Sequence, residues 1–336
     1  KAQQQGSYVS WRIKRKAGQV IELARVNGRG FPTSAMQIDH MLEPWYDGTA
    51  VWQYNKKGLN EFTVSQLSHT GKAIRSARYT FNRDKSQASI SFDRSFAVSE
   101  RQSAGATALS AITGKADGKS SIGQHRLIFD KSGGVLKRLF EPIGGGTTIP
   151  DTNGAFGRQY SRDKNGQVVE LFNLDFDQKR LTEKSGIAGI KFDRDAQGRI
   201  IKLTRVDKAG DPISVDGKCA VVTYHRDNIG NKISWSCTDE NGDLYFNNEG
   251  YAKASQEFDE YGNITSRRYF QPDGQPTLNS NGVAGVTFEY DNFANPVAGQ
   301  HLGLKGEASV SNNGISSWKS EFDDRRNQIS EQNFGI

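Results

Sequence analysis

The chain has 336 residues, a net charge of +6 at neutral pH and an apolar fraction of 35%. With 36 glycines and only two methionines, this composition is thin for a helical protein and typical of a sheet protein with many turns. No run of 18 apolar residues occurs, which excludes a membrane-spanning helix. The chain starts at Lys1 rather than methionine, so we expect a processed or truncated product, with any signal peptide or lipid anchor upstream.

The charge is unevenly distributed. Residues 1–120 contain 18 Lys and Arg against 9 Asp and Glu, whereas the remainder contains 26 against 29. A basic N-terminal region of this kind can bind nucleic acid, lipid headgroups or an acidic protein, or it can be a solvated surface without a partner. Because no nucleic-acid-binding signature accompanies the charge, we expect no nucleic-acid partner.

In chain order, residues 1–98 form the divergent part. The segment 50–54 alternates like a strand, turn-like residues 55–58 follow, and residues 61–64 alternate again. We interpret residues 1–98 as a β region with decayed copies of a repeat. Residues 99–121 are rich in Ser, Ala, Gly and Lys, and we interpret them as a surface loop or a seam between two halves.

Residues 122–336 form a tandem repeat with a period of 32 residues. Each copy carries a turn of the form Asp-x-x-Gly, in which the aspartate caps the turn and the glycine takes the left-handed conformation. The turn aspartates are Asp163, Asp195, Asp227, Asp259, Asp291 and Asp323, and the turn glycines include Gly166, Gly198, Gly230 and Gly262. We therefore expect one β-hairpin in each copy.

The segments on either side of each turn alternate with period 2, so one face of each hairpin is buried. The predicted fold is all-β: two-stranded repeats of 32 residues form a long, curled antiparallel meander. The alternative arrangement pairs the units into four-stranded blades, which would give a propeller of about five blades.

Two cysteines, Cys219 and Cys237, lie in the same copy of the repeat. A four-residue turn would place Val222 opposite Trp235 and Ala220 opposite Cys237, and a one-residue bulge would then bring Cys219 across from Cys237. We predict a disulfide, with two buried free thiols as the alternative. Closing a loop of roughly 19 residues would contribute about 3 kcal/mol and would indicate an oxidising compartment such as the periplasm.

The turns look faintly like calcium loops, since residues 193–200 match the start of one. Thr204 stands where a bidentate glutamate is needed, however, and turn capping explains the same residues. The histidines lack ligand spacing, and no nucleophile elbow is present. We therefore expect no metal, no cofactor and no catalytic residues.

One copy is clearest, over Phe258–Ala284: an aromatic residue and Asp-x-x-Gly-Asn, then Asp273-Gly274-Gln275-Pro276, then Asn281-Gly282-Val283-Ala284. This form resembles the YD/RHS-type tandem repeats of bacterial envelope and toxin-system proteins, over about two thirds of the chain. The 32-residue period is longer than that of typical YD repeats. The resemblance implies an interaction scaffold. Some proteins with such repeats act as periplasmic immunity proteins that block secreted lipase or phospholipase effectors, such as those of type VI secretion, and the resemblance implies this role as well.

Repeat arrays present extended surfaces, and exposed residues that break the pattern are the best binding candidates. Aromatic and arginine side chains dominate interface energetics, although edge-of-core packing also explains each aromatic. The candidate partner-binding residues are Trp45, Tyr46, Tyr261, Arg267, Arg268, Tyr269, Phe270, Trp318, Arg325 and Arg326.

Three hypotheses follow for function. The first is an exported, non-catalytic protein of the periplasm or cell envelope whose partner is another protein, most concretely a toxin effector. The second is a cell-wall or glycan-binding module in which exposed aromatics stack on sugars. The third is an enzyme hosted in the divergent first 120 residues. In the repeat region we expect no enzyme, because its equivalent aspartates lack the unlike environments that a catalytic pair requires.

Overall fold

The computed structural model describes residues 10–26, 29–32, 49–92, 122–142, 144–151, 153–324 and 326–335. Within these ranges the chain is all-β and has no helix that could span a membrane. The strands are β1 (Ser10–Lys16), β2 (Gln19–Val26), β3 (Val51–Lys56), β4 (Glu61–Leu67), β5 (Ala73–Phe81), β6 (Gln87–Phe92), β7 (Ile122–Phe129), β8 (Val135–Pro142), β9 (Gly157–Arg162), β10 (Val168–Leu174), β11 (Gly189–Arg194), β12 (Ile200–Val206), β13 (Val221–Arg226), β14 (Lys232–Thr238), β15 (Lys253–Phe258), β16 (Ile264–Phe270), β17 (Gly285–Tyr290), β18 (Pro296–Leu302), β19 (Ser317–Phe322) and β20 (Gln328–Phe334).

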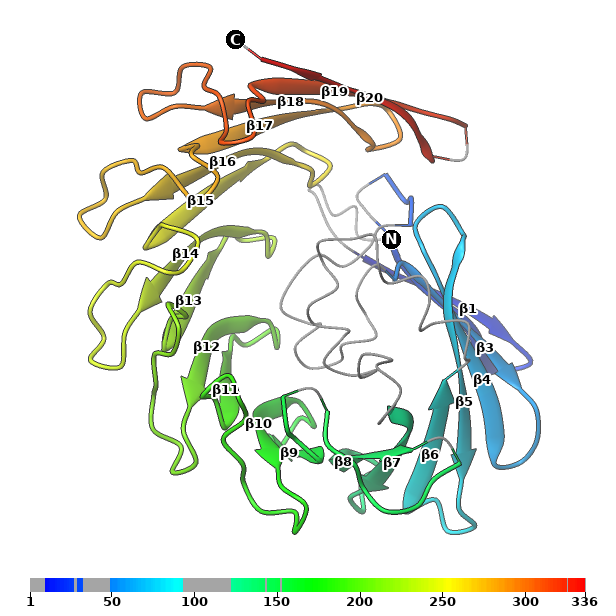
Figure 1. Cartoon of the computed structure of the whole chain (residues 1–336). Helices are drawn as coiled ribbons and strands as arrows, with labels where there is room; N and C mark the ends of the chain where they lie inside the picture. Colours follow the sequence, from blue (N-terminus) through cyan, green and yellow to red (C-terminus); the bar gives the residue numbers. More distant parts are fainter. Residues whose placement is uncertain are drawn as a thin grey trace.

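Each described strand pairs antiparallel with the next along the chain, from β1–β2 through to β19–β20. The described strands thus form one 20-stranded sheet, which confirms the predicted meander and excludes separate propeller blades. The sheet curves strongly, so that β20 and β1 approach each other across a gap (Figure 1). No ladder joins these two strands among the described residues, and the sheet is therefore open.

The Asp-x-x-Gly turns share one hydrogen-bonding scheme. In the turn at Asp259, the amides of Tyr261 and Asn263 both donate to Asp259 Oδ1 at 2.9 Å, and the Asn263 side chain donates to Oδ2 at 2.8 Å. Gly262 has φ +88°. Non-glycine residues at the equivalent position are held in the same left-handed region, with φ 62° at Ala294 and 67° at Arg326. The aspartate caps the turn by satisfying amides that the ladder cannot reach.

A clamp that the turn motif did not predict joins successive copies. The residue just before the turn aspartate reaches back to the first residue of the second strand of the preceding hairpin. In one copy Arg194 Nη2 donates to the Val168 carbonyl at 3.1 Å, while its Nη1 donates to the Gly198 carbonyl at 2.8 Å. Arg162 and Arg226 repeat this arrangement, and Tyr290 uses its hydroxyl to reach Ile264. Charge-assisted bonds to carbonyls thus stabilise the stacking of neighbouring repeats.

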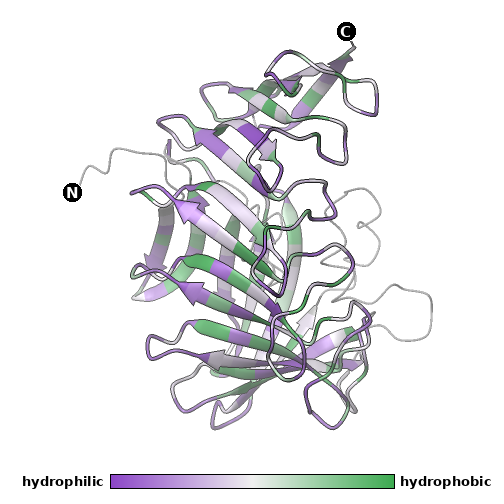
Figure 2. Cartoon of the chain, turned by 90° about the vertical axis from the view of Figure 1, so that its left-hand side faces the viewer, coloured by the Kyte–Doolittle hydropathy of each residue, from purple (hydrophilic) through white to green (hydrophobic). Residues whose placement is uncertain are grey.

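Apolar and polar residues alternate along the strands (Figure 2). Side chains on one face, which we name the aromatic face, line up from strand to strand, because cross-strand partners share a face. Its central cluster consists of Tyr160, Leu171, Phe192, Ile200, Leu203 and Tyr224, each at most 8% exposed. This strip of packed side chains forms the core of the repeat region.

The disulfide between Cys219 and Cys237 is present, with the two Cα atoms 5.2 Å apart. The predicted register was wrong: Val222 lies opposite Cys237 and Tyr224 opposite Trp235. The turn closes through a bond from the Asp227 amide to the Asn231 carbonyl, and a bulge follows at the strand end. Together these move the pairing by two residues. A register shift of two residues leaves every side chain on its expected face. The alternation therefore still places Cys237 on the aromatic face, as predicted.

The first β-hairpin ends like a copy of the repeat. Val26 bridges to Pro32, as Val206 bridges to Pro212 in the regular region, and Gly30 and Gly210 both have positive φ at the same distance from the bridge. The division at residues 99–121 stays a prediction, because those residues lie outside the described ranges.

Candidate functional site

The candidate binding residues divide between several places. Arg267, Tyr269 and Trp318 lie on the aromatic face, whereas Arg268 and Phe270 lie on the opposite face of β16. Trp45, Tyr46 and Arg325 fall outside the described residues. The structure therefore does not bring the predicted residues together in a single patch.

Two of them, Tyr261 and Arg326, lie at a seam where the segment after β2 contacts the turns of the last three hairpins. We define the seam as residues 29–32, after β2, together with the turns that begin at Asp259, Asp291 and Asp323. The Arg29 guanidinium lies 3.7 Å from the Tyr261 ring centroid, and its Nη1 donates to the Asn292 carbonyl at 3.0 Å. One face of the Tyr261 ring is thus already covered within the chain.

Arg326 forms the other half of the seam. Its Nη1 donates to the Pro32 carbonyl at 3.1 Å, and its Nε donates to Asn295 Oδ1 at 3.1 Å. The rings of Phe31 and Phe293 pack with centroids 5.6 Å apart. Burial, and the nearby Arg326 charge, lower the pKa of His69. The seam is held by side chains and loop carbonyls in place of a β-ladder.

A cationic group lies on the aromatic face between β13, β14 and β16. Lys232 Nζ is 4.4 Å from the Trp235 ring centroid and 5.4 Å from that of Tyr224, and Arg267 Cζ is 5.8 Å from the Trp235 ring. Burial, followed by the charges of Arg267 and Arg226, lowers the pKa of Lys232 to about 7. The flanking rings favour a cation, whereas desolvation opposes one, and desolvation dominates.

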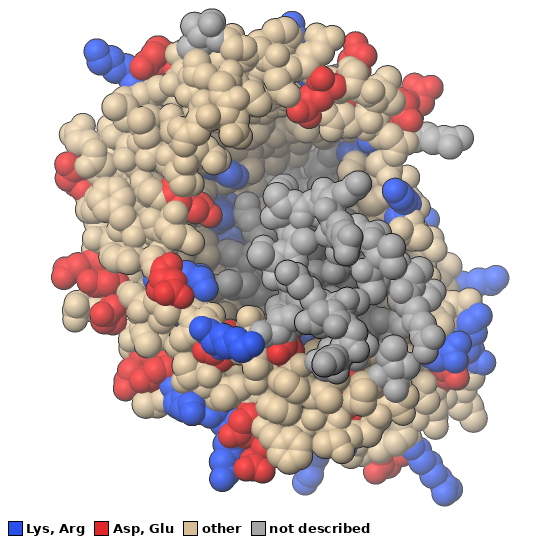
Figure 3. Space-filling view, viewed as in Figure 1, with Lys and Arg blue, Asp and Glu red and all other residues tan. Residues whose placement is uncertain are grey.

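The strands β1–β6 carry a marked excess of positive charge. The described residues of this region contain 13 Lys and Arg but only three Asp and Glu, namely Glu22, Glu61 and Asp84. In the space-filling view, basic side chains gather on the right-hand rim, where Figure 1 places these strands, while acidic side chains are more frequent on the left (Figure 3). We name the exposed surface of β1–β6 and their hairpin loops, which includes both faces of this part of the sheet, the basic surface.

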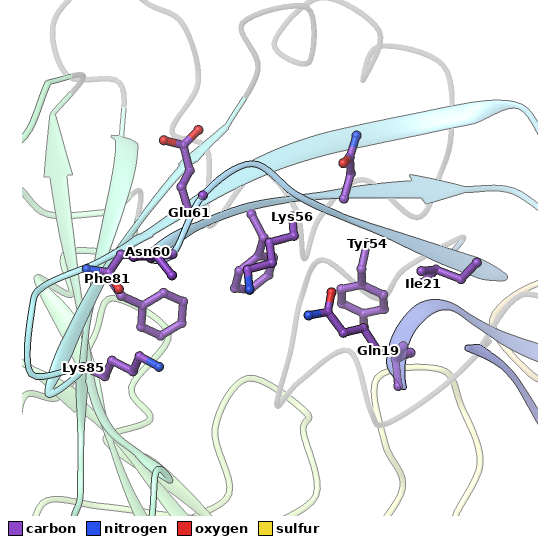
Figure 4. Close-up of a pocket in the computed structure, with 13 residues that line it drawn as sticks. Gln19, Ile21, Tyr54, Lys56, Asn60, Glu61, Phe81 and Lys85 are labelled. Carbon is purple, nitrogen blue, oxygen red and sulfur yellow. The ribbon is translucent and has the colours of Figure 1, made fainter. Parts of the chain in front are cut away.

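A cavity of about 430 Å³ opens on the basic surface at the hairpin ends of β2–β5. Tyr54 and Phe81 lie on the same side of the sheet and line it, while the carboxylate of Glu61 points away (Figure 4). The Phe62 ring continues this apolar floor and stacks on Tyr79 at 4.7 Å. Lys56 and Lys85 also line the cavity. An apolar floor with Lys56 and Lys85 beside it suits a ligand that has both an apolar part and a negatively charged group.

Two carboxylates among the described residues are desolvated enough to be candidates for acid–base chemistry. Burial raises the pKa of Asp151 and of Glu183. Asp151 has a structural role, however, because its Oδ1 accepts the amides of Asn153 and Ala155. Glu183 occupies the equivalent place one repeat later, and its carboxylate accepts the Ser185 hydroxyl at 3.1 Å. No cluster of three or more potential metal ligands occurs among the described residues, and the turn at residues 193–200 is explained by aspartate capping.

Sequence reasoning missed Lys232 and Arg29. The signal for Lys232 was weak, because only the folded hairpin places its ammonium between two rings. Arg29 lies 232 residues from Tyr261 in sequence, and no local pattern could join them.

No family profile matches the chain, and no curated protein matches it. Among solved structures, it is similar to the crystal structure of TcdB2-TccC3-TEV, with 13% identity and a TM-score of 0.36 over 98% of this chain and 18% of that one. The structure of TcdB2-TccC3 without its hypervariable C-terminal region gives 12% identity and a TM-score of 0.33 over 95% of this chain and 17% of that one. The crystal structure of a porin-like protein from Bacteroides uniformis ATCC 8492 gives 8% identity and a TM-score of 0.13, over 84% of this chain and 92% of that one.

This chain thus spans less than a fifth of the TcdB2-TccC3 chains. The likeness to these toxin-complex chains is coarse and extends to the general arrangement of antiparallel hairpins. At these TM-scores it carries no conclusion about activity or partners.

Proposed function

We propose that this chain is a non-catalytic, protein-binding repeat protein of the bacterial envelope, most concretely an immunity protein that binds and occludes a secreted toxin effector. The repeat form of residues 258–284 supports the link to toxin systems, since it resembles YD/RHS-type repeats. An array of stacked hairpins offers the extended surface that binding a protein requires.

The single observation that carries the proposal is the basic surface of β1–β6. In the regular repeats, charged residues stabilise the fold: the turn aspartates cap turns, and the arginines before them bind carbonyls of the neighbouring copy. The described part of β1–β6 has an excess of ten positive charges, more than its three carboxylates can neutralise. Such a patch steers an acidic partner toward the protein and favours its binding over that of other proteins.

The disulfide between Cys219 and Cys237 is compatible with export to an oxidising compartment. An immunity protein of the envelope would meet an effector there. Occlusion needs no catalytic residue in the inhibitor, because a tightly bound surface excludes substrate from the effector's site.

The test is partner capture with the whole chain. Affinity-tagged protein, incubated with envelope extract of its source and with candidate effectors encoded by neighbouring genes, is expected to retain an acidic protein and to inhibit that effector. Retention should weaken steeply as salt increases, because the contacts are charged. Recovery of no protein partner, with no protection from any neighbouring effector, would refute the proposal.

A glycan-binding module is the second candidate, and the cavity lined by Tyr54 and Phe81 is the observation that favours it. Sugars stack on aromatic rings of this kind. A glycan array tests it, with Tyr54→Ala as the disabling variant. Tyr261→Ala serves as the comparison, because Arg29 already covers one face of that ring. Absence of glycan binding, or binding unchanged by Tyr54→Ala, removes this candidate.

A further inference from the structure

Among the described residues, β1 is an edge strand of the sheet, and its side chains are exposed. Among the described strands, β1 pairs only with β2. Residues 11–20 are all exposed, and the side chains of Trp11 and Ile13 are each 51% exposed. An edge strand presents a row of unpaired backbone groups, and these can template the addition of another strand.

The register shows which backbone groups of β1 face the open edge. The Arg25 amide donates to the Ala50 carbonyl, so the backbone groups of Arg25 point toward β3. Trp11 lies opposite Arg25, and Ile13 lies opposite Leu23 two residues along. In an antiparallel pair the hydrogen-bonding direction alternates from residue to residue. The N–H and C=O groups of Trp11 and Ile13 therefore point away from β2, while those of Arg12 join the β1–β2 ladder.

The two faces of β1 differ in chemistry. On one face lie Arg12, Lys14 and Lys16, and among the described residues the carboxylate that pairs with them is that of Glu22. Its Oε1 is 2.8 Å from Lys14 Nζ and 3.7 Å from Arg12 Nη2. The side chains of both cations remain about half exposed, at 53% and 43%. On the other face lie Trp11 and Ile13, followed by Arg15 near the hairpin end, and the Trp11 ring packs 5.6 Å from that of Trp52.

We propose that β1 binds an extended acidic segment of a partner protein as an additional strand. The segment would alternate acidic and apolar residues, with the acids beside Arg12 and Lys14 and the apolar residues beside Trp11 and Ile13. The proposal rests on the protein-binding function above and specifies its surface and the chemistry of its partner.

Charge decides which strand can add. Lysines on an edge strand ordinarily prevent edge-to-edge association, because two like-charged strands repel each other. The same charges attract an acidic strand, so they select the partner as well as excluding a second copy of β1. The opposite end of the meander, β20, is also largely exposed, but Glu331 is its sole charged residue. It is therefore a weaker match for β1 than an acidic strand is.

Hydrogen bonding of a partner strand to the β1 backbone distinguishes the proposed binding mode from simple electrostatic attraction to a polyanion. An anionic membrane or a nucleic acid would use the charges of the basic surface without needing the Trp11 and Ile13 backbone. A β-strand uses both, because main-chain hydrogen bonds give affinity and alternate side chains give specificity.

The experiment uses the full chain and two peptides of the same composition. In one, glutamate alternates with valine; in the other, the glutamates and valines form separate blocks. Titration calorimetry is expected to show binding of the alternating peptide, and hydrogen exchange is expected to show protection of the Trp11 and Ile13 amides. Equal binding of the block peptide, or of anionic vesicles or single-stranded DNA without that protection, would overturn the proposal.

Two variants make the test specific. Ile13→Pro removes an outward-facing N–H but leaves the β1–β2 ladder, and it should weaken peptide binding about tenfold. The double variant Arg12→Glu/Lys14→Glu should reject the glutamate–valine peptide and accept a lysine–valine one. Thermal unfolding checks that both variants fold. If folded Ile13→Pro binds the peptide as tightly as the unsubstituted chain, the proposal fails.

The outcome is separable from that of the proposed function. A captured partner that binds Ile13→Pro normally would leave the protein-binding function standing and refute the role of β1. Peptide binding at β1 without any recovered envelope partner would support the role of β1 and refute the proposed function. Concentration-dependent dimerisation through β1, measured by sedimentation, would assign the edge to a second copy of this chain and overturn the proposed partner.

Discussion

Substitution of Lys232 by methionine should stabilise the fold at neutral and acidic pH. Methionine keeps most of the side-chain length and removes the charge. In the folded chain, burial and the charges of Arg267 and Arg226 lower the pKa of Lys232 from 10.5 to about 7. No carboxylate forms an ion pair with it among the described residues. The charged form is therefore disfavoured by folding.

The magnitude follows from the pKa. A fall from 10.5 to about 7 corresponds to about 5 kcal/mol between the two protonation states. Lys232 is half-buried, however, and its contacts with the Tyr224 and Trp235 rings offset about 0.5–2 kcal/mol of that cost. We expect Lys232→Met to raise the free energy of unfolding by about 1–3 kcal/mol below pH 7.

The sign of the pH dependence follows by linkage. Between pH 7 and 10.5 the unfolded chain holds a proton on Lys232 that the folded chain has released. Stability therefore rises with pH across this window, and the cost of the charge is fully present below it. The gain from Lys232→Met should shrink as pH rises through the window and vanish above it.

The assay is urea unfolding at pH 6, 8 and 9.5, followed by tryptophan fluorescence. Lys319→Met provides the matched control, because Lys319 is exposed on β19. Comparison of the two variants removes the titration of all other groups. If Lys232→Met and Lys319→Met show the same stability relative to the unsubstituted chain at every pH, the argued environment of Lys232 is wrong.

Three further predictions concern the turns, the disulfide and the seam. Asp259→Ala should lower the free energy of unfolding by about 1–2 kcal/mol, since two amides lose their acceptor, and Asp259→Asn should recover part of this loss in the same urea titration. Cys237→Ser should cost about 3 kcal/mol, and reductant should destabilise the unsubstituted chain but leave this variant unaffected. Arg29→Ala should speed proteolytic cleavage near residues 29–32 and 291–295 without unfolding the repeats, because the seam is held by side chains; unchanged cleavage would contradict this.

Much of the repeat region was accessible from sequence because its determinants are local. A capping aspartate and a left-handed residue specify a turn within five residues, as at Asp259, and period-2 alternation specifies which face is buried. The pairing of Cys219 with Cys237 followed from the same alternation even though the register was two residues off. A displacement by an even number preserves faces, so the prediction tolerated the error.

The candidate site was less accessible for a physical reason. Arg29 meets Tyr261, and Arg326 meets Pro32, because many small rotations between strands accumulate until the ends of the sheet approach. No residue pattern encodes that sum. The basic charge of the first strands was visible in the composition, but its placement on an open edge was not.

The amino-acid sequence by itself determined the repeat, its turns, the all-β class and the disulfide, since each depends on residues a few positions apart or on one fixed period. Only the tertiary structure decided that the array is one open sheet, that side chains close its seam, and that β1 presents the backbone groups of Trp11 and Ile13 to solvent. These features depend on how the twist of the twenty described strands accumulates along the sheet, and the interactions that produce them act between residues that are distant in the chain.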